Sequence, residues 1–418
     1  MKTPRTSIPS LAQIEAEVMA EGREWTRQRL QARLQQLAQE QGEVFPQSQR
    51  RLIHRHAYRF HLDTGAGRVE IQTFYGQDPA DQHWGCPLRE RWQLAAYQQL
   101  SPCWQQHLAF ALTVTTSYEG AAALLRQLGH PADDATLHAL AQTLGARAEA
   151  QTQRRLAQPA TEPTPQRAAS QVGVLMLDGW QVRQRGAGWG KKKTAQPRVE
   201  WHELKTGVFY LQEQAAHKNG RGIVSDKVVV SWQGEPLELG GRLHHAACEH
   251  GLGRARQKLV VSDGAPWIWN VAQDRWKGAV EVLDFYHASE HVWTLGEAVR
   301  GTREAARGWV EKLLHQMRHG QHAAALRTIA ELTAGRGAPG KVIRREQNYF
   351  AEHAARMNYR AVAERGWPIG SGPVESACLQ RQGRLKRSGQ SWTPLGLRHL
   401  CALIEARQNG HWDALWNQ

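Results

Sequence analysis

Three acidic residues stand where their carboxylates could do chemistry. Asp178 follows the apolar run VGVLML, Asp263 follows KLVVS, and a glycine comes directly after each aspartate. Glu375 opens a helix-like run after the turn WPIGSGPV. Convergent carboxylates repel one another unless cations lie between them, and hard divalent ions such as Mg²⁺ prefer oxygen ligands. Two such ions about 3.5–4 Å apart can clamp a phosphodiester, because one activates the nucleophile and the other stabilises the leaving oxygen.

Each of these acids also has an ordinary structural explanation. An Asp-Gly pair often starts a turn. Around the third acid, Glu375, the sequence suits the start of a helix. Gly372 is a tolerable N-cap, Pro373 suits the first helical residue, and Glu375 suits the positive end of a helix. The catalytic interpretation therefore requires that the three carboxylates meet in space.

Two basic segments lie beside these acids in the sequence. Residues 181–198 carry six positive charges and no acid, and a second basic run follows Glu375. The candidate DNA-binding residues are Lys191, Lys192, Lys193, Arg381, Arg384, Lys386 and Arg387. The whole chain has 53 Lys and Arg against 39 Asp and Glu, a formal net charge of +14. This excess favours a polyanionic partner, because phosphate neutralisation releases counterions, although a basic ribosomal or membrane-surface protein would share it.

A third group of polar residues lies in the segment LDFYHASEH. His287, Glu290 and His291 spell H-x-x-E-H, which matches a zinc-peptidase pattern in which two histidines one helical turn apart share a metal. A short match of this kind arises easily, and the sequence shows no third ligand.

The apolar runs predict the elements that must position these residues. Five strands are predicted, with a helix at 239–255 between the third and the fourth; the strands lie at 172–180, 201–211, 227–234, 258–263 and 279–287. The first three strands suit an antiparallel meander, and the helix lets the fourth return parallel beside the first. That order places Asp178 and Asp263 side by side, and it favours Asp263 over Asp284 as the second metal ligand.

The N-terminal part of the chain has a different pattern. Residues 10–41 read as a helix, 50–75 as two strands around a Gly-rich turn, and 92–155 as helices. Within the last range, 117–129 and 135–150 suit a helix-turn-helix, with Asp133 or Asp134 as N-cap. A plain helical hairpin is the alternative for this pair. A proline-rich linker follows at 158–170.

Taken in order, the motifs LDGW, VSDGAPWIW, LDFYHASEHVW and GSGPVESACLQRQGRLKRSGQSW, spread over 171–400, resemble those of DDE-type insertion-sequence transposases with a ribonuclease-H-like catalytic domain. The resemblance implies that Asp178, Asp263 and Glu375 form the acidic triad and hold two Mg²⁺ or Mn²⁺ ions. It makes Asp284 and His287 auxiliary residues near the triad, which orient a metal-bound carboxylate or contact the DNA backbone.

The expected fold class is α/β. It comprises a ribonuclease-H-like mixed five-stranded sheet with flanking helices and a helical insertion, preceded by a mainly helical N-terminal region. The expected domains are an N-terminal helix, a DNA-binding region, a linker and a catalytic domain that contains the insertion; their ranges are 1–45, 46–157, 158–170, 171–408 and about 296–365.

The expected activity is DNA strand cleavage at transposon ends, followed by strand transfer into target DNA. The partners would be the terminal inverted repeats and the target duplex, bound by a homodimer or larger assembly because two ends must be joined. A nuclease of the same fold and a non-catalytic DNA-binding protein are the alternatives.

Five scattered cysteines without a CxxC pair argue against a four-cysteine zinc site. The chain shows neither a signal-like start nor an apolar run of membrane-spanning length, so we expect a cytoplasmic, nucleoid-associated protein.

Overall fold

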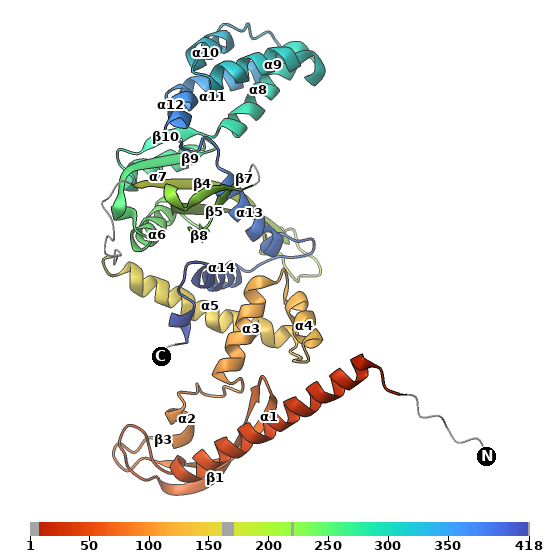
Figure 1. The fold of residues 1–418 in the computed structure, drawn as a ribbon, viewed down its shortest axis with the longest axis vertical. Coiled ribbons are helices and arrows are strands. Elements are labelled where there is room, and N and C mark those ends of the chain that lie inside the picture. The colour runs from red at the N-terminus through yellow and green to blue at the C-terminus, as the bar shows by residue number, and fades with distance from the viewer. Residues whose placement is uncertain (1–7, 161–170, 219–220, 417–418) are drawn as a thin grey trace, which may run out of the picture. The chain divides into compact units, whose positions relative to one another are not determined.

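The computed structural model describes residues 8–160, 171–218 and 221–416 (Figure 1). The chain divides into two compact units, Met1–Ala141 and Gln142–Gln418. Residues 161–170, which make up most of the predicted linker, lie outside the described residues. None of the helices in the described ranges combines the length and the apolar character that a membrane span requires.

The first unit begins with the long helix α1 (Leu11–Gln41), which packs against a small antiparallel sheet. Ser10 starts the helix, because its hydroxyl accepts a bond from the Gln13 amide while the Gln13 side chain accepts one from the Ser10 amide. The sheet consists of β1 (Ile53–Thr64), β2 (Gly67–Gln77) and β3 (Trp84–Gly85). The two strands expected between 50 and 75 are therefore present, with Gly67 at a positive φ of 116° in their turn.

Helices complete the first unit. They are α2 (Pro87–Arg91), α3 (Pro102–Val114), α4 (Tyr118–Gln127) and the start of α5 (Asp134–Leu156). The Ser117 hydroxyl caps α4 by accepting from the Gly120 amide at 2.9 Å, and the Asp133 carboxylate accepts from the Thr136 amide at 2.6 Å where α5 begins. The two helices of the expected helix-turn-helix thus form; their binding of DNA stays a prediction.

The second unit is built on a five-stranded mixed sheet with the order β10-β9-β4-β5-β8. Its strands are β4 (Gln171–Arg185), β5 (Val199–Leu211), β8 (Val228–Trp232), β9 (Ala255–Ser262) and β10 (Val280–Leu283). The pairs β4–β5 and β5–β8 are antiparallel, while β9 is parallel to β4 and β10 is parallel to β9. This confirms the predicted strand order and the ribonuclease-H-like fold class. A small hairpin of β6 (Ala215–Lys218) and β7 (Arg221–Val224) was not predicted.

Helices cover both faces of the large sheet. On one face, Leu175 and Leu177 of β4 share a buried core with α6 (Pro236–Glu249) and α7 (Pro266–Arg275). Side chains of a strand alternate between faces, so Val174, Met176 and Asp178 point to the other side. There α13 (Gly372–Leu385) packs on β4 and β5, and α14 (Pro394–Gln408) packs on β8. Cover on both faces explains why β4 reads as an unbroken apolar run.

A block of helices follows β10 and forms the expected insertion (Figure 1). It comprises α8 (Phe285–Arg300), α9 (Arg303–Arg318), α10 (His322–Ala330), α11 (Ala338–His353) and α12 (Tyr359–Glu364). The block begins at Phe285, earlier than the predicted start near residue 296, because Asp284 caps α8 immediately after the strand. The chain leaves and re-enters the sheet region at one place, where the Phe285 amide donates to the Ile369 carbonyl at 2.9 Å.

Candidate active site

Asp178 lies within β4 at the point where β4 loses its parallel neighbour. The sequence predicted a strand over 172–180, but β4 continues to Arg185, and Asp178 pairs with Thr206 of β5. On the other side, the pairing of β4 with β9 stops at Leu177 and Ser262. Asp178 is therefore the first residue of β4 beyond the end of β9, which is the carboxyl edge where ligand sites collect in such sheets.

Asp263 directly follows β9, and hydrogen bonds to its side chain and to its backbone hold it in place. Its carboxylate accepts a hydrogen bond from the Ala265 amide at 3.1 Å, and its carbonyl accepts one from the Tyr349 hydroxyl at 3.1 Å. Gly264 has a φ of +101°, and a Cβ there would lie 3.0 Å from His353 Nε2 and 3.3 Å from the Tyr349 hydroxyl. Only glycine suits this turn, which brings two side chains of α11 against the Asp263 peptide.

Glu375 lies in the first turn of α13 with its side chain near Ser371. The helix begins at Gly372 with Ser371 as N-cap, one residue earlier than predicted. The Ser371 hydroxyl contacts Glu375 Oε1 at 2.9 Å and Asp284 Oδ2 at 2.6 Å, and it caps no backbone amide of the helix. Glu375 is exposed.

The three acids of the predicted triad are near enough to affect one another. The pKa of Asp178 is raised, first because the group is buried and further because the negative charges of Asp263 and Glu375 lie close to it. Hydrogen bonds from the Cys378 thiol and the Gly179 amide act in the opposite direction. The structure thus places Asp178 and Asp263 at the ends of paired strands and Glu375 on a helix that packs on β4.

The donor chemistry of this site fits a hard divalent cation. Asp178, Asp263 and Glu375 offer carboxylate oxygens only, which Mg²⁺ and Mn²⁺ prefer. Across residues 8–160, 171–218 and 221–416, no three His, Cys, Asp or Glu side chains are already gathered in a geometry that could hold a metal ion.

Asp284 follows β10 and is fully buried. Its oxygens accept hydrogen bonds from the His287 amide at 2.7 Å and from both the hydroxyl and the amide of Ser371. Because β9 separates β10 from β4, Asp263 is the closer neighbour of Asp178 in the sheet order. Asp284 thus ties the start of α8 to the start of α13.

His287 and His291 contact each other through their Nε2 atoms, 3.3 Å apart. The Nδ1 atom of His291 lies 2.5 Å from Glu346 of α11, so both ring nitrogens of His291 have partners. The Glu290 side chain, the third member of the H-x-x-E-H pattern, is 81% exposed. The structure therefore places a buried glutamate from the insertion beside the two histidines, a neighbour that the sequence did not indicate.

The predicted DNA-binding residues fall into two groups. Lys191, Lys192 and Lys193 in the β4–β5 loop are exposed, as are Lys386 and Arg387 after α13. In contrast, Arg381 and Arg384 are only 3% and 5% exposed.

The two buried arginines make interior contacts. Arg381 Nε donates to the Ser231 hydroxyl at 3.3 Å, and its guanidinium lies 3.9 Å from Glu405. The Arg384 guanidinium lies 5.7 Å from the centroid of the Trp392 ring. Both residues therefore lie inside the unit rather than on its surface.

Two exposed tryptophans near the basic loop were not singled out from the sequence. Trp189 lies 5.2 Å from the guanidinium of Arg185, and Trp201 lies 5.9 Å from that of Arg183. The Lys386 ammonium is 5.7 Å from the same Trp201 ring. The signal in the sequence was an indole within a run rich in arginine and lysine, which is a nucleic-acid-binding composition.

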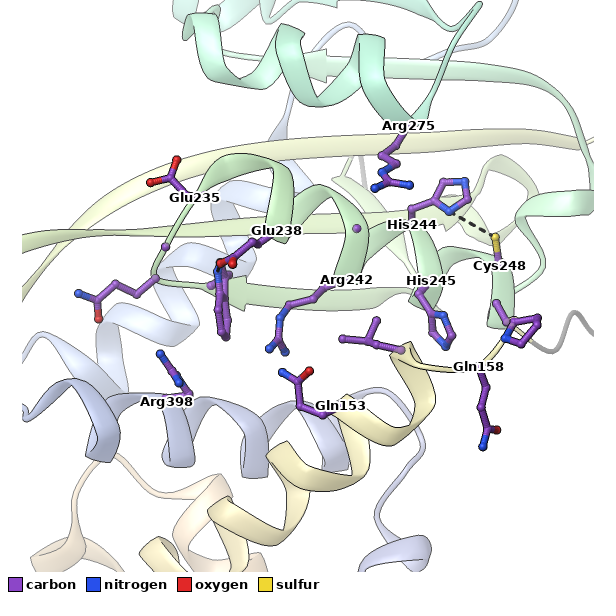
Figure 2. A pocket seen from close by; sticks show the side chains of 17 residues that line it. Gln153, Gln158, Glu235, Glu238, Arg242, His244, His245, Cys248, Arg275 and Arg398 are labelled. Atoms are coloured by element: carbon purple, nitrogen blue, oxygen red, sulfur yellow. Dashed lines mark hydrogen bonds between the residues drawn. The ribbon is translucent and has the colours of Figure 1, made fainter.

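A wide groove of about 1040 Å³ lies elsewhere in the second unit (Figure 2). It is lined by the end of α5, by α6 and by α14, and the triad acids are not among its residues. Arg242 and Arg398 both approach the Trp232 ring, at 3.7 and 5.0 Å, and Arg242 also pairs with Glu149 at 2.7 Å. Arg242 is thus engaged by both an aromatic ring and an acid, and Arg398 by the same ring.

Comparison with solved structures gives a distant resemblance. No family model matches the chain, and no curated protein matches it. Among solved structures, the Drosophila P element transposase strand transfer complex aligns with 74% of this chain and 92% of that chain, at 11% sequence identity and a TM-score of 0.33. No residue role is transferred from that protein.

Proposed function

We propose that this protein is a DDE-type transposase, which cleaves DNA strands at the ends of an insertion sequence and transfers them into target DNA. The observation that supports it most is the convergence of Asp178, Asp263 and Glu375 at the carboxyl edge of the ribonuclease-H-like sheet. Asp178 and Asp263 directly follow the paired residues Leu177 and Ser262 on two neighbouring parallel strands, and α13, which carries Glu375, packs on β4. A structural role for each acid alone gives no reason for that convergence.

The three acids would hold two Mg²⁺ or Mn²⁺ ions, which when bound activate the attacking oxygen and stabilise the leaving oxygen of a phosphodiester. In the first step, water attacks the phosphorus at the transposon end, and the bond to the 3′ oxygen breaks. In the second, the freed 3′-hydroxyl attacks a phosphorus of the target and displaces its 3′ oxygen. The protein's part is to hold the acids in place: the Cys378 thiol hydrogen-bonds Asp178, Tyr349 holds the Asp263 peptide, and Ser371 links Glu375 to Asp284.

The exposed basic and aromatic residues of the second unit would bind the DNA. Lys191, Lys192 and Lys193 would neutralise phosphates, as would Lys386 and Arg387. The exposed rings of Trp189 and Trp201 would stack on bases that become unpaired near the cleaved end. Arg381 and Arg384 are omitted from this surface because they are buried.

Helix α1 of the first unit has an exposed apolar surface through which two protein copies could associate, one on each DNA end. Leu11, Val18 and Trp25 recur every seven residues along α1, and they are 79%, 60% and 65% exposed. This spacing places them at one position of the coiled-coil heptad, and Ile14 lies at the adjoining seam position. We propose that a second copy of this chain covers this seam.

Strand cleavage and joining on duplexes that carry the terminal inverted repeat test the function. With Mg²⁺, the wild-type protein should nick the end and join it to a target duplex, whereas Asp178→Ala should do neither. Asp274→Ala is a matched control, because Asp274 is an exposed acid on α7 and should leave both activities unchanged.

The outcomes separate the alternatives. A nuclease of the same fold would cleave without joining, and a non-catalytic DNA-binding protein would bind the duplex and do neither. If Asp178→Ala cleaves and joins like the wild type, the assignment of the triad is wrong.

A further inference from the structure

Glu346 is a buried acid that the proposed reaction does not yet use. Its side chain is completely buried in α11, within the helical insertion. One oxygen accepts a hydrogen bond from His291 Nδ1 at 2.5 Å, and the other accepts two from Arg345 at 2.5 and 2.8 Å. Burial opposes ionisation, but these bonds outweigh it and hold the pKa of Glu346 below its usual value. A buried charge is costly unless it is paired. The partners of Glu346 therefore indicate which groups its charge holds in place.

The bond from His291 to Glu346 fixes the protonation pattern of two histidines. Because Nδ1 of His291 donates to a carboxylate, Nε2 of a neutral His291 is left as an acceptor. The Nε2 of His287, 3.3 Å away, must then carry the proton of that contact. Glu346 thereby sets the tautomer and the orientation of both rings, including His287 at the start of α8.

The same histidine also supports the catalytic edge of the sheet. The His291 ring stacks on the ring of Tyr349, with centroids 3.8 Å apart and planes 10° from parallel. The Tyr349 hydroxyl donates to the carbonyl of Asp263 at 3.1 Å. A continuous series of contacts therefore runs from Glu346 through His291 and Tyr349 to the peptide of Asp263.

We propose that Glu346 is a positioning residue for Asp263. It holds the His291 ring, the ring holds Tyr349, and Tyr349 fixes the peptide from which the Asp263 carboxylate projects. The insertion is then part of the active site and not only an appendage. This inference rests on the proposed function, because it assigns Asp263 to a metal-binding role.

The direct test measures metal affinity. A loss of Mn²⁺ affinity would not follow from loosened packing alone. Glu346→Gln keeps the size of the side chain and removes its charge. Tyr349→Phe keeps the ring and removes only the hydroxyl that reaches Asp263. Each variant should weaken Mn²⁺ binding, measured by calorimetry on the protein without DNA, by about 10–100-fold. The Mg²⁺ concentration that half-saturates cleavage should rise to a similar extent, while the Kd for duplex DNA stays within about twofold.

A double variant checks that the two residues act along one path. If Glu346 acts through Tyr349, the combined Glu346→Gln/Tyr349→Phe change should weaken Mn²⁺ binding no more than the larger single change. Glu352→Gln is the matched control, since Glu352 is an exposed acid on the same helix. Phe350→Leu loosens the buried packing next to His291 without altering charge, and it should lower the thermal midpoint but not the Mn²⁺ affinity.

Three results would overturn the proposal. These are unchanged Mn²⁺ affinity in Glu346→Gln, fully additive losses in the double variant, or an equal loss in Phe350→Leu. Should Glu346→Gln fail to fold, Tyr349→Phe decides alone, and unchanged affinity in that variant contradicts the role. The Asp178→Ala variant distinguishes a failure of the role proposed for Glu346 from a failure of the proposed function. If Asp178→Ala still cleaves, the function is wrong, whereas loss of cleavage there with normal Mn²⁺ affinity in Glu346→Gln removes only the role of Glu346.

Discussion

Ser371 donates both its backbone amide and its hydroxyl to a single oxygen of Asp284, 87 positions earlier in the chain. The same hydroxyl oxygen lies 2.9 Å from Glu375 Oε1. A hydroxyl has only one hydrogen, so it shares that hydrogen between two carboxylates. Ser371 is thus the residue through which the buried end of β10 restrains the exposed acid of α13.

Replacement of Ser371 by alanine should reduce both stability and cleavage. The buried Asp284 loses a bond from a hydroxyl, and a hydrogen bond to a charged group is worth about 2 kcal/mol. We expect urea unfolding to show a loss of that size, and the rate of strand cleavage to fall because Glu375 loses its restraint. Ser376→Ala, at an exposed position beside Glu375, should change neither. Normal cleavage by Ser371→Ala would show that Glu375 needs no such support.

The three lysines of the β4–β5 loop should contribute to DNA affinity in a salt-dependent way. Replacement of Lys191, Lys192 and Lys193 by alanine should flatten the plot of log Kd against log salt by up to about 0.9 for each phosphate that the loop no longer neutralises. The thermal midpoint should stay constant, because all three side chains are exposed. Lys277→Ala, an exposed lysine after α7, serves as the control. An unchanged slope would exclude the loop from the DNA interface.

Glu405 should give the protein a pH-dependent stability. Burial raises its pKa from 4.5 to about 7, against the opposing effects of the Arg381 charge and the Ser231 amide. The folded state therefore binds more protons than the unfolded state between these values. The stabilisation is complete below about pH 4.5 and is lost as the pH rises through about 7.

Comparison with Glu405→Gln isolates this effect from other titrating groups. The unfolding free energy of the wild type, minus that of the variant, should fall by about 1–3 kcal/mol between pH 5 and pH 8. Urea unfolding at several pH values measures it. A difference that stays constant over this range would mean that Glu405 titrates normally.

A charge in the apolar stripe of α1 should separate the protein copies. Val18→Glu places a carboxylate at the middle of the Leu11, Val18 and Trp25 repeat, where it would be buried against its equivalent in a dimer. Sedimentation should then show a smaller species than for the wild type. Ala16→Glu, at an exposed position on the opposite face of the same helix, is the control. Identical sedimentation of the wild type and Val18→Glu would place the contact elsewhere.

The strand order was predictable because each strand of the sheet is a separate apolar run with its own turn signals. The position of Asp178 was only partly predictable. Gly179 suggested a strand end, yet the backbone continues in register with β5 through Gly179 and Lys205. A glycine after an acid marks either a turn or a close approach, and the sequence alone does not distinguish them.

The interior place of Arg381 and Arg384 could have been foreseen from helical spacing. Val374, Ala377 and Cys378 mark the inward face of α13, and positions 381 and 384 continue it. Glu346 had no comparable signal, because its contact with His291 joins helices that are 55 positions apart in the chain.

The adjacency of Asp284 and Ser371 has a consequence for how this protein could change over evolutionary time. All of the helices α8–α12 lie between Asp284 and Ser371, which are hydrogen-bonded to each other. The two ends of the insertion are therefore adjacent. For a chain closed in this way, each doubling of length costs only about 0.6 kcal/mol. The length of the insertion can therefore change where its helices do not contact the edge of the sheet. The segments of α8 and α11 that carry His291, Glu346 and Tyr349 must be retained, because they reach the Asp263 peptide.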